Sequence, residues 1–400
     1  MLTGNALVGQ SGGPTSVINS SVAGVIQSAK NVPQIENIFG MRYGIEGLMQ
    51  DNVFDFGAES DEAIEGLRST PSSACGSCRY KLKDEDLPLV LEKLKKFNIR
   101  YFFLIGGNDT MDTVHRVEAY AQSQDYDMIG VGIPKTVDND LFGTDHTPGY
   151  ASAAKYMALS VLQAGVLTRD MKKVDQFVVF QCIGREAGWL PAAASLAKEC
   201  DADAPHITLF PERAFDKDKF IAKVKEVYDK HGFVSVVCGE GITHADGSPV
   251  SASETRDKFN NVEFGAMGGS AVAVVLHKMI ADEYGFRGEF QVTESLPMCA
   301  ADRGVAQDFE DAYQCGVKAV ELAAAGTTGV MVSMTREKGS ATSTFETAPL
   351  CDVAVKAKPM PDEFISEDGF SVTDAYIEYA KPLVGELPSY TKLAYNAVDM

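Results

Sequence analysis

The segment from 134 to 140 combines a cation, a hydroxyl and two carboxylates. It reads Pro-Lys-Thr-Val-Asp-Asn-Asp, so Lys135, Thr136, Asp138 and Asp140 lie within six residues. Phosphoryl transfer uses this mixture, because a lysine neutralises phosphate charge and a carboxylate accepts the proton of the attacking hydroxyl. A solvated turn would explain the two aspartates but not the lysine among them. We therefore expect these four side chains to take part in phosphoryl transfer.

Gly12 and Gly13 lie between a short apolar run and a helical pattern. Glycines let the backbone approach a ligand, and the amide groups at a helix start attract phosphate. A glycine turn needed only for tight packing of a strand against a helix would look the same, so both interpretations stay open. No G-x-x-x-x-G-K-[ST] segment follows an apolar run, which excludes a P-loop.

A second glycine turn, Gly-Gly-Asn-Asp-Thr at 106–110, carries an amide, a carboxylate and a hydroxyl. The side-chain oxygens of Asn108 and Asp109, beside Gly107, suit a magnesium ion that also contacts phosphate. The same residue types begin helices well, so a purely structural role is an open alternative.

Two arginines add local positive charge next to glycines. Arg79 follows Gly76-Ser-Cys, and Arg185 follows Ile183 and Gly184. Planar guanidinium groups pair well with phosphate oxygens. Single arginines are usually surface residues, so the interpretation depends on the motifs around them.

Short apolar runs precede these motifs, and each is followed by glycine and polar residues and then by a helical pattern. They cover 6–8, 101–105, 128–133, 177–183 and 233–238. This alternation predicts an α/β fold with a mostly parallel sheet. Ligands bind outside the carboxyl ends of parallel strands, so we expect a site built from several loops.

Composition narrows the class of protein. The 400 residues carry 56 acidic and 36 basic side chains, a formal charge of −20, which argues against nucleic acid or an anionic membrane as a partner. The length favours two lobes or one large domain.

A signal peptide and a long apolar span are absent, so we expect a cytoplasmic protein. Cys75 and Cys78 form the only CxxC, which we interpret as reduced thiols rather than a redox pair.

Taken in order, these motifs resemble the phosphofructokinase family. The resemblance covers most of the chain and rests on Gly12-Gly13 with Asn19, 76–79, 106–110, 134–140, 183–185, 210–212, Glu240 and 358–361. It implies two Rossmann-like lobes, with mostly parallel sheets, facing a central cleft. We expect the larger lobe to comprise 1–148 plus about 288–335, and the smaller 149–287 plus about 336–400.

The resemblance also implies individual roles. Asp138 matches the family's general base toward a sugar 1-hydroxyl, with Asp140 and Thr136 organising the charge around it. Arg79 and Arg185 match contacts to the transition state and substrate. The other implied contacts are to the phosphoryl donor, from Gly12, Gly13, Gly107, Asn108 and Asp109, and to the sugar phosphate, from Thr136, Ile183, Gly184 and Glu240.

The choice of donor depends on two positions. Where members that use ATP carry glycine, this sequence has Asp109 and Lys135. A carboxylate at Asp109 would occupy and repel part of a nucleotide site, and an ammonium at Lys135 would compensate a compact, highly charged donor. Together they favour pyrophosphate.

The sequence departs from the family pattern at three places. Asn108 replaces a metal-binding aspartate, Gln176 replaces an arginine that reaches a neighbouring subunit's sugar phosphate, and Met298 replaces an arginine of the Leu-Gln-Arg stretch. The residues that hold the 6-phosphate are therefore open, with Lys172, Lys173, Arg287 and Arg303 as candidates.

We expect an enzyme that uses pyrophosphate and Mg²⁺ to phosphorylate the 1-hydroxyl of fructose 6-phosphate, as a homodimer or homotetramer. Three alternatives stay open: ATP as the donor, sedoheptulose 7-phosphate as the acceptor, and a catalytically silent regulatory subunit. A nicotinamide-dependent oxidoreductase is disfavoured, because Gly9-x-x-Gly12-Gly13 lacks the G-x-G-x-x-G spacing.

Overall fold

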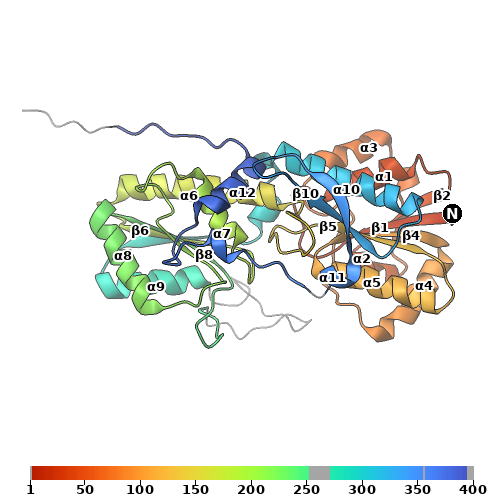
Figure 1. Cartoon of the computed structure of the whole chain (residues 1–400), viewed down its shortest axis with the longest axis horizontal. Helices are drawn as coiled ribbons and strands as arrows, with labels where there is room; N and C mark the ends of the chain where they lie inside the picture. Colours follow the sequence, from red (N-terminus) through yellow and green to blue (C-terminus); the bar gives the residue numbers. More distant parts are fainter. Residues whose placement is uncertain (1, 252–270, 355, 394–400) are drawn as a thin grey trace, which may run out of the picture.

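A computed structural model describes residues 2–251, 271–354 and 356–393. It contains two sheets, each flanked by helices, which lie side by side along the long axis (Figure 1). The expected α/β class and two-lobe arrangement are confirmed. Within the described residues, no helix is long and apolar enough to cross a membrane.

The larger sheet has seven strands in the order β11-β10-β5-β4-β1-β2-β3. Its strands are β1 (Gly4–Gln10), β2 (Ile35–Met41), β3 (Val53–Asp55), β4 (Ile99–Gly106), β5 (Ile129–Pro134), β10 (Val330–Thr335) and β11 (Thr344–Pro349). The five central strands run parallel, and only β3 and β11, at the two edges, are antiparallel to their neighbours. The carboxyl ends of β1, β4 and β5 therefore meet at one edge of the sheet.

Both faces of this sheet are covered. Successive side chains of a strand point to opposite faces, so Tyr101, Phe103 and Ile105 join one apolar cluster while Phe102 and Leu104 join another. The covering helices are α1 (Ile18–Ala29), α2 (Gly44–Met49), α3 (Asp61–Gly66), α4 (Leu87–Lys96), α5 (Asn108–Ser123), α10 (Ala306–Ala324) and α11 (Leu350–Val353). Burial on both sides explains why the strands read as continuous apolar runs.

The smaller sheet has four parallel strands in the order β7-β8-β6-β9. They are β6 (Phe177–Cys182), β7 (Ile207–Leu209), β8 (Val234–Gly239) and β9 (Gly288–Val292). The helices of this part are α6 (Tyr150–Met171), α7 (Trp189–Ala193), α8 (Lys217–His231), α9 (Val272–Tyr284) and α12 (Asp374–Val384). The loops after β6 and β8 leave the sheet together, because these two strands are neighbours.

Sheet membership differs from the expected lobes at two strands. β9 pairs with β6 in the smaller sheet, although 288–335 was expected in the larger lobe. β11 pairs with β10 in the larger sheet, although 336–400 was expected in the smaller lobe. The exact lobe boundaries stay a prediction, and parts of the expected smaller lobe, 252–270 and 394–400, lie outside the described residues.

Candidate active site

One cleft of about 690 Å³ is lined by the residues that the sequence singled out for catalysis, donor binding and sugar binding, apart from the four candidates for the 6-phosphate. Its walls come from the loops after β1, β4 and β5 of the larger sheet and after β6 and β8 of the smaller sheet. The predicted residues that line it are Gly12, Gly13, Arg79, Gly107, Asn108, Asp109, Lys135, Thr136, Asp138, Asp140, Ile183, Gly184, Arg185 and Glu240. The site lies at the strand ends that the apolar runs predicted.

The glycine turn after β1 is held by the 76–79 loop. Gly12 has a φ of 76°, in the left-handed region that glycine adopts without strain. Its N–H donates to the Cys78 carbonyl at 3.1 Å, and its carbonyl accepts from the Ser77 hydroxyl at 2.6 Å. These two bonds fix the turn against the loop that carries Arg79, which is why two separate sequence motifs share one wall.

Lys135 is almost completely buried, with 3% of its surface exposed. Its Nζ donates to the Gly13 carbonyl at 2.5 Å. Burial lowers the pKa of Lys135 to about 8, and the carboxylates of Asp138 and Asp140 act in the opposite direction. The ammonium is thus aimed at the glycine turn before any ligand arrives.

Two carboxyl groups face this lysine from its own loop. Burial, reinforced by the charge of Asp140, raises the pKa of Asp138 to about 7, against the opposing effect of Arg185. Burial also raises the pKa of Asp140. A carboxylate with a pKa near 7 accepts a proton efficiently at neutral pH, as a general base must.

Hydrogen bonds around Asn139 set the shape of this loop. Asn139 has a φ of 56°, and its side chain accepts from the Thr147 N–H at 3.1 Å and donates to the Tyr379 hydroxyl at 3.0 Å. The Thr147 hydroxyl donates to the Thr136 carbonyl at 2.8 Å. Thr136 in turn accepts from the Asp138 N–H at 3.1 Å. The backbone that carries Asp138 is therefore held on both sides.

The smaller sheet contributes Arg185 and Glu240 from adjacent strand ends. Glu240 accepts the N–H groups of Gly184 and Arg185 at 3.3 and 3.2 Å. Burial raises the pKa of Glu240. Arg185 is exposed to the cleft at a φ of 49°, so Glu240 holds the backbone of this loop while the guanidinium reaches the open space.

Asn108 and Asp109 begin α5, so the expected helix start is present. Within the described residues, the buried Oδ1 of Asn108 has no hydrogen-bond partner. Asp109 is exposed, and its carboxylate lies 3.6 Å from Lys81 Nζ. No group of three or more His, Cys, Asp or Glu side chains in 2–251, 271–354 and 356–393 forms a protein-only metal cage. An orphaned amide oxygen beside a carboxylate fits a magnesium ion that keeps water and phosphate ligands.

The candidates for the sugar 6-phosphate do not line this cleft. Arg287 pairs with Asp175 at 2.9 Å, and Arg303 donates to the Ser160 hydroxyl at 2.7 Å. Lys172 donates to the His231 carbonyl at 3.1 Å. Binding of the sugar 6-phosphate by these residues or by Lys173 stays a prediction.

Several lining residues were not predicted as site residues. They are Lys81, Glu294, Ser295 and Met298, together with neighbours of the predicted motifs. Lys81 follows Arg79 by two residues, so its charge next to a phosphate motif was the available signal. Glu294 and Ser295 follow β9, whose short run was not recognised as a strand.

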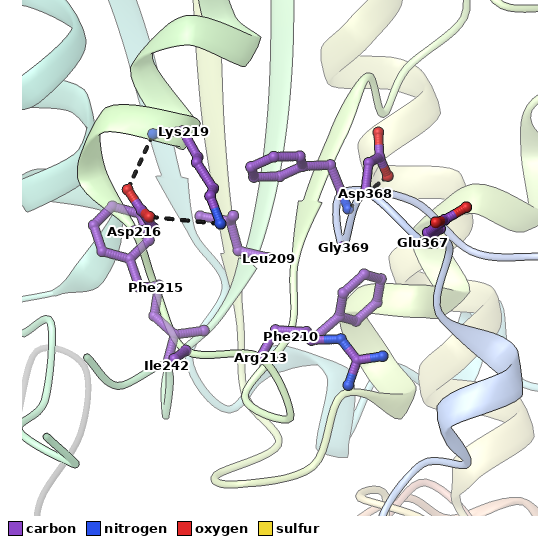
Figure 2. Close-up of a pocket in the computed structure, with 12 residues that line it drawn as sticks. Leu209, Phe210, Arg213, Phe215, Asp216, Lys219, Ile242, Glu367, Asp368 and Gly369 are labelled. Atoms are coloured by element: carbon purple, nitrogen blue, oxygen red, sulfur yellow. Dashed lines mark hydrogen bonds and ion pairs between the residues drawn. The ribbon is translucent and has the colours of Figure 1, made fainter. Parts of the chain in front are cut away.

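A second cavity, of about 220 Å³, lies in the smaller lobe between the loop after β7 and residues 367–370 (Figure 2). Asp216 caps α8 by accepting the N–H groups of Asp218 and Lys219. Arg213 pairs with Asp362 at 2.5 Å. Arg213 and Asp216 of this cavity are thus engaged in local contacts.

Known proteins resemble this chain along its whole length. The phosphofructokinase family matches residues 5–323. The pyrophosphate–fructose 6-phosphate 1-phosphotransferase of Methylococcus capsulatus is 39% identical, over 100% of this chain and 98% of the relative. The enzyme of the same name from Halomonas elongata is 38% identical, over 99% and 97%. The crystal structure of the pyrophosphate-dependent phosphofructokinase from Nitrosospira multiformis has a TM-score of 0.86 at 38% identity, over 97% of this chain and 94% of that one. The chain therefore belongs to the phosphofructokinase family.

Proposed function

We propose that this enzyme transfers a phosphoryl group from pyrophosphate to the 1-hydroxyl of fructose 6-phosphate, giving fructose 1,6-bisphosphate and orthophosphate. The observation that carries the proposal is the meeting of Lys135, Asp138 and Arg185 in one cleft. The names of the full-length relatives support the same donor and acceptor.

Asp138 acts as the general base. The 1-hydroxyl oxygen forms a bond to one phosphorus of pyrophosphate, the bridging P–O bond on that phosphorus breaks, and orthophosphate leaves with the bridging oxygen. The hydroxyl proton passes to the Asp138 carboxylate, whose pKa of about 7 suits the transfer at neutral pH. Asp140 and Thr136 organise the charge and backbone around this group.

The cations neutralise charge as the phosphoryl group moves. Lys135 is held at the glycine turn, Arg185 reaches in from the smaller lobe and Arg79 from the 76–79 loop. Charge stabilisation by groups already in place supplies most of the catalysis in phosphoryl transfer. Glu240, with Ile183 and Gly184, contacts the sugar.

Mg²⁺ would be held by Asp109 and by the Oδ1 of Asn108, with water and phosphate oxygens completing its ligands. When bound, it supplies positive charge to the oxygens of pyrophosphate. The chain's own contribution is to present these two oxygens at the start of α5, next to Gly12 and Gly13.

Two side chains of this enzyme favour pyrophosphate over ATP. Both stand at positions where family members that use ATP carry glycine. Asp109 lines the cleft, and its carboxylate pairs with Lys81, which lines the same cleft. Lys135 fills the space near the glycine turn with a fixed ammonium. Pyrophosphate, a compact tetra-anion, is stabilised by the Lys135 ammonium, whereas the adenosine group of ATP would contact the Asp109–Lys81 pair.

The substitution Asp138→Asn tests the proposal, with formation of fructose 1,6-bisphosphate from pyrophosphate as the assay. Turnover is expected to fall about 100- to 10,000-fold, the usual loss for a general base. Asp282→Asn, an exposed change in α9, is the control and is expected to leave turnover unchanged. A wild-type chain without turnover would contradict the proposal and favour a silent regulatory subunit.

The remaining expectations are part of the proposal. The enzyme works as a homodimer or homotetramer in the cytoplasm. Fructose 6-phosphate is preferred to sedoheptulose 7-phosphate. Size measurement in solution and an assay with both sugars test the first and last of these statements.

A further inference from the structure

The C-terminal segment 356–360 pairs with the loop that carries Asp138 and Asp140. Ala357 forms an antiparallel bridge with Leu141. The Lys358 N–H donates to the Asp140 carbonyl at 2.7 Å. A segment far along the chain therefore completes the backbone hydrogen bonding at the end of the 135–140 loop.

The Lys358 side chain is partly buried beneath the same loop. Its Nζ donates to the carbonyls of Thr144 and Asp145 at 3.1 and 2.7 Å. It also lies 5.0 Å from the centre of the Trp189 ring, and the Trp189 Nε1 donates to the Lys358 carbonyl at 3.4 Å. Burial lowers the pKa of Lys358 to about 8, and Asp145 and Asp140 oppose this effect.

The other end of the segment is bound to the smaller lobe. Glu212 accepts the Met360 N–H at 3.2 Å and the Gly188 N–H at 2.8 Å with the same oxygen. Gly188 follows Arg185 by three residues. In Figure 1 the blue C-terminal chain passes from α11 of the larger lobe to α12 of the smaller lobe. The segment thus links the Asp138 loop to the Arg185 loop.

Several charged groups face the two aspartates. Lys135 from their own loop and Arg185 from the loop after β6 act on both. Glu240 at the end of β8 acts on Asp138, and Lys358 from the C-terminal segment acts on Asp140. Lys358 differs from the other cations because it does not line the cleft. Its ammonium therefore lies behind the loop, where it is held by the Thr144 and Asp145 carbonyls.

We propose that Lys358 is a positioning residue for phosphoryl transfer: it fixes the Asp140 end of the loop through its backbone N–H and holds a positive charge behind Asp140. The inference rests on the proposed function for its kinetic part only. A neutral side chain at 358 would remove the Lys358 donor from the Thr144 and Asp145 carbonyls, leave the Asp145 carbonyl with the Tyr379 hydroxyl, and take this cation away from Asp140.

The kinetic test compares Lys358→Met with Lys356→Met. Lys356 is two residues away, exposed and paired with Asp352 at 3.3 Å, so it is a matched control. Without the cation the pKa of Asp140 rises. Because Asp138 and Asp140 are neighbouring carboxyl groups that titrate as a pair, the acid limb of the kcat–pH profile should move up by about one pH unit. At pH 6.5 kcat should fall about five- to tenfold, since a one-unit shift changes the reactive fraction by that factor. The KM values for both substrates should stay within about twofold of wild type.

The emission of Trp189 gives a readout that needs no turnover. Trp189 is the only tryptophan in the sequence, so its fluorescence reports on Lys358 directly. Lys358→Met should change this emission and Lys356→Met should not. If wild type lacks activity with pyrophosphate but the emission changes as expected, the proposed function is wrong, whereas the contact between Lys358 and Trp189 is supported.

Lys358→Arg covers the case in which Lys358→Met does not fold. It keeps the positive charge, so its acid limb should lie within about 0.3 pH unit of wild type. A full-unit shift in Lys358→Arg would contradict the inference. An unmoved acid limb in a folded Lys358→Met, whether kcat is normal or is lowered equally at every pH, would also overturn it.

Discussion

The Nζ of Lys135 donates a hydrogen bond to the carbonyl of Gly13 over 2.5 Å. This bond joins the loop after β5 to the glycine turn after β1. The neighbouring Gly12 has a φ of 76°, a left-handed conformation that glycine adopts without strain, and this conformation shapes the turn beside the ammonium. The cation is in place before the donor binds, which avoids reorganisation during the reaction.

The pH dependence of kcat/KM for pyrophosphate should be bell-shaped. Asp138 must be deprotonated to act as a base, so the rate constant rises as pH passes about 7. Lys135 must be protonated to neutralise the donor, so the rate constant falls as pH passes about 8. A series of initial rates from pH 5.5 to about 9.5 measures both limbs.

Lys135→Arg distinguishes the lysine from ionisations of pyrophosphate itself. A guanidinium stays protonated throughout this range, so the alkaline limb of the variant should move to a pH above about 9 even if its maximal rate is lower. The ionisations of the substrate are common to both enzymes. An alkaline limb that stays near its wild-type position would argue against the role of Lys135.

Loss of the amide oxygen of Asn108 should weaken magnesium binding. Asn108→Leu is expected to raise the Mg²⁺ concentration for half-maximal rate about tenfold or more, since a metal-site partner is removed. A chelator should abolish turnover in both proteins. Asn31→Leu, an exposed change after α1, should behave as wild type. An unchanged Mg²⁺ requirement in Asn108→Leu would remove this residue from the metal site.

The packing of α1 on α10 depends on two glycines. A Cβ on Gly316 would overlap the Ser21 carbonyl oxygen, and a Cβ on Gly24 would overlap the Tyr313 carbonyl oxygen. Gly316→Ala should therefore lower the free energy of unfolding by about 1–3 kcal/mol, as overpacking does. Urea unfolding measures this change.

Gly66→Ala is the matched control for that experiment. Gly66 has helical dihedrals in α3, and a Cβ added to it would have no atom within 4 Å. Alanine there should raise the free energy of unfolding by about 0.5–1 kcal/mol, the difference in helix propensity. Equal effects of the two substitutions would mean that the α1 and α10 backbones can separate at no cost.

The main site could be predicted from the sequence because its polar residues come after apolar runs that form buried strands. Lys135 and Asp138 follow β5 of the larger sheet, and Arg185 follows β6 of the smaller sheet, so each motif was predicted at a strand end, and the two sets of loops line one cleft. The conformations of these short loops depend on hydrogen bonds from residues close in the sequence, such as Asn139 and Thr147.

Long-range contacts were outside the reach of the sequence. Lys358 contacts Asp140 because the segment 356–360 returns to the loop that carries Asp138, and no apolar run or helical pattern marks that return. Arg287 and Arg303 looked available for phosphate, yet Asp175 and Ser160 occupy them. β9 lies at a sheet edge and its three central residues are exposed, so its short run lacked the apolar pattern of the central strands.

The most direct test is the specificity for the phosphoryl donor, measured as kcat/KM with pyrophosphate and with ATP in parallel at saturating fructose 6-phosphate. With Asp109 and Lys135 in the cleft, the value for pyrophosphate should exceed that for ATP by at least about 1000-fold, because a site of fixed charges strongly rejects a poorly matched ligand. Comparable values for the two donors, or a higher value for ATP, would contradict the account.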